Sequence, residues 1–324
     1  MANHARVLYN ANHIMNCRHT IAQAWLFTRE NKKMMWWYAF VPSVLTTTVG
    51  IFSLLYQYFA FKRSPIFDNA PKSFLNEVIS TTLDFFSAHG DLFVPTLVVG
   101  AIVLVLYLLL PTLMQAAMIK AIAQKKRGSE LKIVEGFSLG MLSFLPLFEY
   151  NLLIKTFSLF SILTETAFIW RNLGSGAMKF LFPIVLLVIS VGLVLTLLFT
   201  YADFFIVLDK KPILRAMGRS AKLVILSWQH TFLIVILMLI IGLRMVINIL
   251  AVLLVPALLF FSVGFIASIT LSTIGIFIGI VVSAIGLFVA SYFSGVLHVF
   301  ANTVWTFSFL ELNEEKHTKE AMSE

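Results

Sequence analysis

Long apolar stretches dominate the pattern of hydrophobic and polar positions along this chain. A transmembrane helix needs about 20 apolar residues to cross ~30 Å of hydrocarbon. Six stretches meet that length, and they predict an all-α, polytopic membrane helical bundle of about six transmembrane helices. The stretches cover residues 36–61, 93–119, 144–169, 179–207, 229–254 and 271–300.

The last third of the chain allows two interpretations. No Asp, Glu, Lys or Arg occurs between residues 249 and 299. This region fits the end of one span, a non-polar outer hairpin near residues 260–264, and a final span. It also has room for a seventh span, which would place the C-terminal tail on the other side of the membrane.

Three similar segments favour six spans. Residues 21–36, 133–148 and 213–228 each combine an amphipathic stretch with the start of an odd-numbered span. The even-numbered spans also end alike, which predicts three hairpin units with interfacial amphipathic helices. Aromatic and basic residues gather at the boundaries of many membrane proteins, so a chance likeness is the alternative. The three similar ends are Gln115-Ala116-Ala117, Tyr201-Ala202-Asp203 and Phe300-Ala301-Asn302.

Residues 213–227 illustrate the interfacial pattern. Ile213, Met217, Ser220, Val224 and Ser227 share one face at helical spacing, and basic residues occupy the other. Such a helix is expected to lie in the headgroup plane with its basic face towards phosphate. The surface basic residues of this kind are Lys125, Lys126, Arg127, Arg215, Arg219 and Lys222.

Charge asymmetry predicts the orientation. Fifteen of the 24 Lys and Arg residues lie before span one, between spans two and three, and between spans four and five; the opposing connections hold five. Cytoplasmic loops carry such an excess. We therefore expect a multi-pass protein of the cell membrane with both termini cytoplasmic. Its parts would be an N-terminal segment with an interfacial helix (1–35), a membrane domain (36–310) and an acidic tail (311–324).

Several short motifs resemble a known family. They are Ala24-Trp25 with Asn31-Lys32, Gly128 with Glu135-Gly136-Phe137, and Arg215-Ala216 with Arg219-Ser220. Together they resemble the membrane domain of bacterial glycerophosphodiester phosphodiesterases and related stand-alone six-span proteins. The resemblance covers most of the chain. It implies fold and membrane location but not the phosphodiesterase activity, because the sequence contains no soluble catalytic domain of that kind.

Composition excludes an ordinary soluble domain and a nucleic-acid partner. Only 12% of the residues are charged and 59% are apolar or aromatic, whereas soluble domains carry about 25% charged residues. The net charge of +8 points to anionic lipid headgroups as partners. Basic patches interleaved with aromatic residues, which bind single-stranded nucleic acid, are absent from the sequence.

Residues 62–92 form the one sizeable connection on the predicted outer side. Asn69 is positioned to cap a helix whose first turn contains Pro71, and Gly90 is positioned to end it. This helix either closes the outer surface or gates a substrate path.

Catalytic and metal motifs are weak. Residues 136–140 match G-x-S-x-G, but that nucleophile elbow requires a strand-to-helix turn, and here it falls in a predicted helix. His4, His13, Cys17 and His19 lack the second ordered ligand pair of a zinc site. We therefore expect no metal, no cofactor and no catalytic residue.

Ionisable residues inside spans are costly and often functional. Glu149, Asp203 and His298 lie at a similar depth near the cytoplasmic ends of their spans. Arg244 lies about 24 Å along span five, where Glu165 is its natural partner. These five residues either stabilise the bundle or line a polar cavity for a headgroup or an ion.

Small residues form a stripe in span six, at Gly275, Gly279 and Ser283. Another helix can pack closely there, from this chain, from a second copy or from another membrane protein. Taken together, these features favour a non-enzymatic membrane protein that binds or transports lipid or a small amphiphile. A scaffold protein, or an enzyme acting on lipid headgroups through Glu149, Asp203 and His298, is the alternative.

Overall fold

The computed structural model describes residues 17–62, 74–129, 133–155, 159–247, 250 and 272–321. All regular structure in these ranges is helical, which confirms the predicted all-α class. Its elements are helix 17–30, α2 (Lys32–Met34), the π-helical η1 (Met35–Phe40), α3 (Val41–Lys62), α4 (Phe74–Ala88), η2 (Gly90–Leu92), α5 (Phe93–Lys126), α6 (Ile133–Lys155), α7 (Leu159–Leu198), α8 (Ala202–Val207), α9 (Ile213–Leu226), helix 228–247 and α11 (Ser272–Ala321).

Six helices among the described residues are long and apolar enough to cross a membrane, so the chain is a multi-pass membrane protein. The question of a seventh span falls on residues 251–271, which lie outside the described ranges. The six spans are Lys32–Lys62, Gly90–Lys126, Val134–Ile154, Gly176–Leu198, Trp228–Ile247 and Val281–Glu314.

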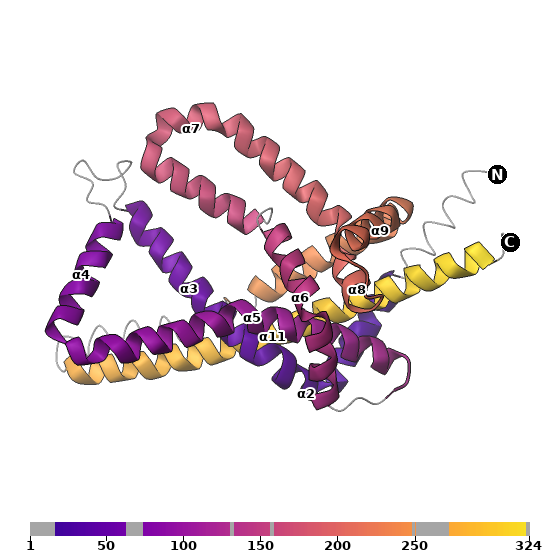
Figure 1. The fold of residues 1–324 in the computed structure, drawn as a ribbon, viewed down its shortest axis with the longest axis horizontal. Coiled ribbons are helices and arrows are strands. Elements are labelled where there is room, and N and C mark those ends of the chain that lie inside the picture. The colour runs from indigo at the N-terminus through magenta and orange to yellow at the C-terminus, as the bar shows by residue number, and fades with distance from the viewer. Residues whose placement is uncertain are drawn as a thin grey trace.

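The bounds of all six predicted spans shift, and the sixth, predicted at 271–300, runs over Val281–Glu314. The predicted span 144–169 is divided, because α6 ends at Lys155 and α7 begins at Leu159. α7 then breaks at Gly174, whose φ of 75° is open to glycine but disfavoured for other residues. Figure 1 shows the two arms of α7 joined by this bend. The fourth span also ends at Leu198 rather than at residue 207, and α8 follows as a separate short helix.

Two of the three expected interfacial segments are separate helices. Helix 17–30 ends in a turn at Asn31, and α9 ends in a turn at Ser227. The middle segment, by contrast, continues into its span as the single helix α6. α9 buries Ala216, Ser220, Leu223 and Val224 and exposes its basic side chains as predicted. Of the predicted apolar face, Ser220 and Val224 are buried, and the other three residues are partly exposed.

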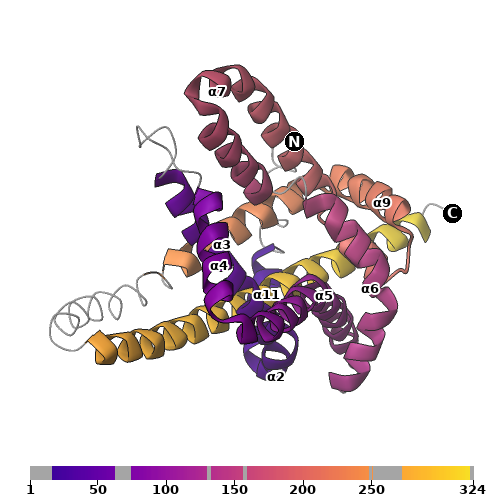
Figure 2. The ribbon, with the colours of Figure 1, turned by 60° about the vertical axis from the view of Figure 1, so that its left-hand side comes forward.

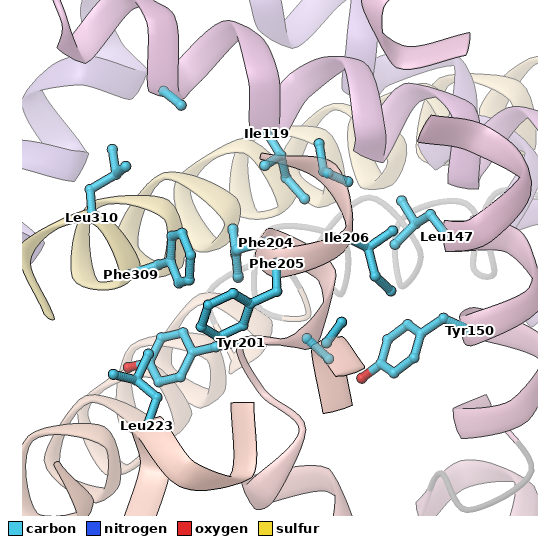
Figure 3. Close-up of a cluster of buried hydrophobic side chains, with 14 of the residues drawn as sticks. Ile119, Leu147, Tyr150, Tyr201, Phe204, Phe205, Ile206, Leu223, Phe309 and Leu310 are labelled. Carbon is cyan, nitrogen blue, oxygen red and sulfur yellow. The ribbon is translucent and has the colours of Figure 1, made fainter. Parts of the chain in front are cut away.

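The helices converge at one end of the molecule, which we call the packed end, and spread apart elsewhere (Figures 1 and 2). The packed end holds two clusters of buried apolar residues. One, drawn in Figure 3, joins α5, α6, α8, α9 and α11 through residues such as Ile119, Leu147 and Phe309. The other joins helix 17–30, η1, α5, helix 228–247 and α11. Away from these clusters, large apolar side chains such as Leu104 and Leu187 are exposed, as lipid-facing residues are in a membrane.

Small residues allow α5 and α6 to approach closely. A Cβ atom on Gly140 would lie 2.8 Å from the backbone nitrogen of Ala117, and one on Gly136 would overlap the hydroxyl of Tyr38. The buried Lys120 adds a hydrogen bond of 2.6 Å from its ammonium to the carbonyl of Leu139. The two glycines of the G-x-S-x-G match therefore let α6 pack closely, Gly140 against α5 and Gly136 against Tyr38 of η1.

Replacing Gly140 with Ala is expected to destabilise the protein by about 1–3 kcal/mol, because α5 would have to move away. Gly218 is the matched control, since it also lies in a helix but has open space around it. Gly218→Ala should be neutral or stabilising by up to about 1 kcal/mol. Thermal unfolding of both variants in one detergent measures the difference, and equal stability of Gly140→Ala and wild type would contradict the packing role.

Candidate functional site

The site begins where the chain leaves the span Gly176–Leu198 and turns into α8. The fully buried Tyr201 precedes α8, and its backbone N–H donates to the Ser220 hydroxyl at 3.0 Å. The same hydroxyl donates to the carbonyl of Leu198 at 2.8 Å. One side chain of α9 thus holds both sides of the turn and fixes the start of α8, where Asp203 lies in the first turn.

Asp203 faces α5 and is only half satisfied. The Gln115 amide nitrogen donates to its Oδ2 at 2.7 Å. The other oxygen, Oδ1, is buried and has no hydrogen-bond partner. Because buried polar atoms are nearly always paired, this oxygen marks a place where a ligand or water molecule can donate.

A short polar chain extends from Asp203 into α6. The Asn151 amide nitrogen lies 3.4 Å from the Gln115 side-chain oxygen and 3.3 Å from the Thr112 hydroxyl. These contacts orient the Gln115 amide so that its nitrogen points at the carboxyl group. The polar groups are therefore ordered before any ligand arrives.

Asp203 lines an open pocket of about 470 Å³ at the packed end. Its polar residues include Gln115, Asn151, Asp203 and Asn302, and its walls are largely apolar. No Lys, Arg or second carboxylate lines it among the described residues. The apolar and aromatic lining residues are Ile154, Leu193, Leu197, Phe199, Phe204, Val235, Ala301 and Trp305.

Three of the polar residues come from the three similar span ends. Gln115, Asp203 and Asn302 belong to Gln115-Ala116-Ala117, Tyr201-Ala202-Asp203 and Phe300-Ala301-Asn302, and all three line the same pocket. Asn302 also donates to the His298 carbonyl at 2.9 Å, which fixes its amide. The three span ends therefore meet at one pocket, although Gln115 is the first residue of its triplet and Asp203 and Asn302 are the third residues of theirs.

Burial raises the pKa of Asp203 from its ordinary 3.8 to about 7, and the hydrogen bond from Gln115 opposes part of that rise. Both protonation states are consequently accessible near neutral pH. The ionised carboxylate accepts hydrogen bonds from a cationic or hydroxyl-bearing group, and the protonated form donates one. Among the described residues no three His, Cys, Asp or Glu side chains gather as metal ligands do.

The other predicted polar residues lie elsewhere. Glu149 and His298 are exposed and do not line the pocket with Asp203. Arg244 and Glu165 are also exposed, and no ion pair joins them in the part of the chain that the structure describes. Arg244 instead lines a separate groove.

The remaining predicted positions are placed as follows. All six surface basic residues are exposed; the Lys126 ammonium lies 3.5 Å from Glu311, and Arg219 lies 4.0 Å from Asp209. Ser283 is exposed on α11. The surroundings of Gly275 and Gly279, like His4 and His13, fall outside what the structure describes.

Sequence reasoning missed a buried polar network beside the pocket. The Cys17 sulfur lies 3.4 Å from His230 Nδ1, and His230 Nε2 lies 3.2 Å from the Ser308 hydroxyl. That hydroxyl contacts the Tyr201 hydroxyl at 2.9 Å, which also lies 3.4 Å from the Thr231 hydroxyl. The members are far apart in sequence, so no periodicity could have revealed the network.

This network is structural rather than nucleophilic. Burial is the main cause that raises the pKa of the Cys17 thiol to about 11, so the thiol stays protonated at neutral pH. A cysteine nucleophile instead requires a lowered pKa and access, and Cys17 has no exposed surface.

The half-satisfied carboxyl group predicts an unusual pH dependence. Because the folded-state pKa of Asp203 lies above its unfolded value, the folded protein retains a proton that the unfolded chain has lost between about pH 4 and pH 7. Its contribution to stability is therefore complete below pH 4 and falls as the pH rises towards 7. Asp203→Asn should remove this dependence and raise the melting temperature at pH 8 by a few degrees.

Melting temperatures between pH 5 and pH 8 measure the effect. Asp209→Asn is the matched control, because Asp209 is a nearby aspartate that lies outside the pocket. That control should keep the slope of the wild type. An unchanged slope in Asp203→Asn would contradict the assignment.

No protein-family model, no curated protein and no solved structure matches the chain. The function is accordingly argued from the geometry of the site.

Proposed function

We propose that this chain is a non-enzymatic integral membrane protein that binds a small amphiphile in the Asp203 pocket. Release of the bound amphiphile elsewhere would make it a transporter. The observation that carries the proposal is the buried, unpaired Oδ1 of Asp203 in an otherwise largely apolar pocket. Pockets of this kind hold a ligand by their apolar walls and orient it with few polar groups. The ligand's polar end would carry a donor, such as an amine or a hydroxyl group.

The geometry favours binding over catalysis. The enzyme alternative requires Glu149, Asp203 and His298 to converge on one substrate. Of Glu149, Asp203 and His298, only Asp203 lines the pocket. The Gln115 amide, which donates to its carboxyl group, positions a ligand but does not exchange protons.

The membrane and the orientation belong to the same proposal. The excess of basic residues before spans one, three and five supports a cell-membrane protein with both termini cytoplasmic. With this topology the packed end faces the cytoplasm. Anionic lipid headgroups of the cytoplasmic leaflet are then its proposed partners. The resemblance to the membrane domain of bacterial glycerophosphodiester phosphodiesterases is consistent with location in a lipid membrane. The resemblance itself stays a prediction.

Binding can be tested with three amphiphiles of equal chain length. Decylamine and decanol should be retained at one molecule per protein in native mass spectrometry, and decanoate should not. Asp203→Asn should weaken decylamine binding at pH 8 by about tenfold or more, as expected for a lost hydrogen bond to a charged group. The wild type should also bind decylamine more weakly at pH 6, where Asp203 is largely protonated.

Asp209→Asn controls for the loss of one carboxylate, since Asp209 is outside the pocket. It should bind all three amphiphiles as the wild type does. Equal decylamine binding by the wild type and Asp203→Asn would rule out the pocket as the binding site.

Orientation can be tested by cysteine labelling. The native Cys17 is fully buried, so its background reaction with a maleimide should be slow. Ser87→Cys on α4 should react with a membrane-impermeant maleimide in intact cells. Arg127→Cys, after α5, should react only once the cells are permeabilised, and the reverse pattern would invert the topology.

A further inference from the structure

A second opening lies between helix 17–30 and helix 228–247. This groove has a volume of about 560 Å³, and it shares no lining residue with the Asp203 pocket. Its apolar wall is formed mainly by Ile21, Leu237 and Ile241, and two arginines, Arg18 and Arg244, supply its charge. The groove is thus apolar along its length and cationic at two points.

Among the described residues, no carboxylate pairs with these two arginines. Both side chains are exposed, and neither forms an ion pair with a described residue. The chain segments that directly adjoin the two helices, residues 1–16 and 248–271, contain no Asp or Glu. Arg244 stands in the span Trp228–Ile247, where an arginine requires an anionic or hydrogen-bonding partner, and an anionic ligand would supply one.

The groove also contains an ordered aromatic side chain. Trp25 lines it and meets the ring of Phe300 edge-on, with 5.7 Å between the ring centroids. Tryptophan prefers the boundary between headgroups and acyl chains, where one side of the ring is apolar and its N–H finds a polar partner. Trp25 therefore fits the junction between the polar and apolar parts of a bound lipid.

We propose that this groove binds one anionic phospholipid of the surrounding membrane. Arg18 and Arg244 supply the positive charge that attracts the anionic headgroup, and a planar guanidinium donates two parallel hydrogen bonds to phosphate oxygens. The acyl chains lie along Leu237 and Ile241. The apolar wall favours a lipid over free phosphate, because free phosphate has no apolar part that could bind to the wall.

The groove and the Asp203 pocket lie on different faces of the same helix. Helix 228–247 presents Val235 to the pocket and Leu237 with Ile241 to the groove. The two sites carry opposite charge, so they select different ligands. The lipid site consequently does not rest on the proposed function of the Asp203 pocket.

Native mass spectrometry of the full-length protein tests the proposal. The protein is equilibrated in detergent with equimolar phosphatidylglycerol and phosphatidylcholine of the same acyl chains, and the retained lipids are compared. The wild type should retain one phosphatidylglycerol in preference to phosphatidylcholine. Arg18→Gln and Arg244→Gln should each lower that preference about fivefold, the effect expected for one arginine near a lipid phosphate.

Arg29→Gln is the matched control, because Arg29 is an exposed arginine on the same helix 17–30 but does not line the groove. It should keep the wild-type preference, as should Asp203→Asn. Arg18→Lys with Arg244→Lys retains both charges and should keep most of the preference, which separates loss of charge from loss of fold.

Three results would overturn the proposal. The first is a wild type without preference for phosphatidylglycerol. The second is an equal loss in Arg29→Gln and in the two groove variants, which would indicate a diffuse charge effect. The third is displacement of the lipid by free glycerophosphoglycerol at equal concentration, which would indicate a site for a soluble anion.

Discussion

Hydrogen bonds between buried polar side chains hold the packed end of this protein together. In lipid, apolar helix surfaces gain little by leaving the hydrocarbon for one another, so close packing and interhelical hydrogen bonds carry the association. Tyr201 is the centre of this arrangement, because its hydroxyl reaches both α11 and helix 228–247 while its backbone is tied to α9. Cys17 and His230 extend the network to helix 17–30.

The same network positions both proposed binding sites. Asp203 follows Tyr201 by two residues, so the turn that Ser220 holds also directs the carboxyl group towards Gln115. Helix 228–247 is fixed at its start by His230 and Thr231. Its later residues then form one wall of the Asp203 pocket and one wall of the arginine groove. Ligand sites next to such a fixed frame lose little freedom on binding.

Part of the Asp203 pocket could be predicted from single residues. Asp203 stood out because a carboxylate near the end of an apolar span is rare, and the three span ends that supply Gln115, Asp203 and Asn302 were recognised as alike. What could not be predicted is that these three side chains share one pocket, or that Glu149 and His298 stay outside it. The position of a residue along its span gives only its depth in the membrane. Which way a side chain points depends on the rotation of its helix and on how that helix crosses its neighbours.

The sequence by itself determined the helical class, the six spans among the described residues and the two faces of α9, because each follows from local apolar length and helical periodicity. The tertiary structure decided the break of α7 at Gly174, the separation of α8 from its span, the meeting of Cys17 with His230 and the groove that takes Arg244. Each of these depends on contacts between residues far apart in the chain. In a sequence this apolar, many helix pairings bury similar surface, so a few glycines and polar side chains, rather than the hydrophobic pattern, select the one that forms.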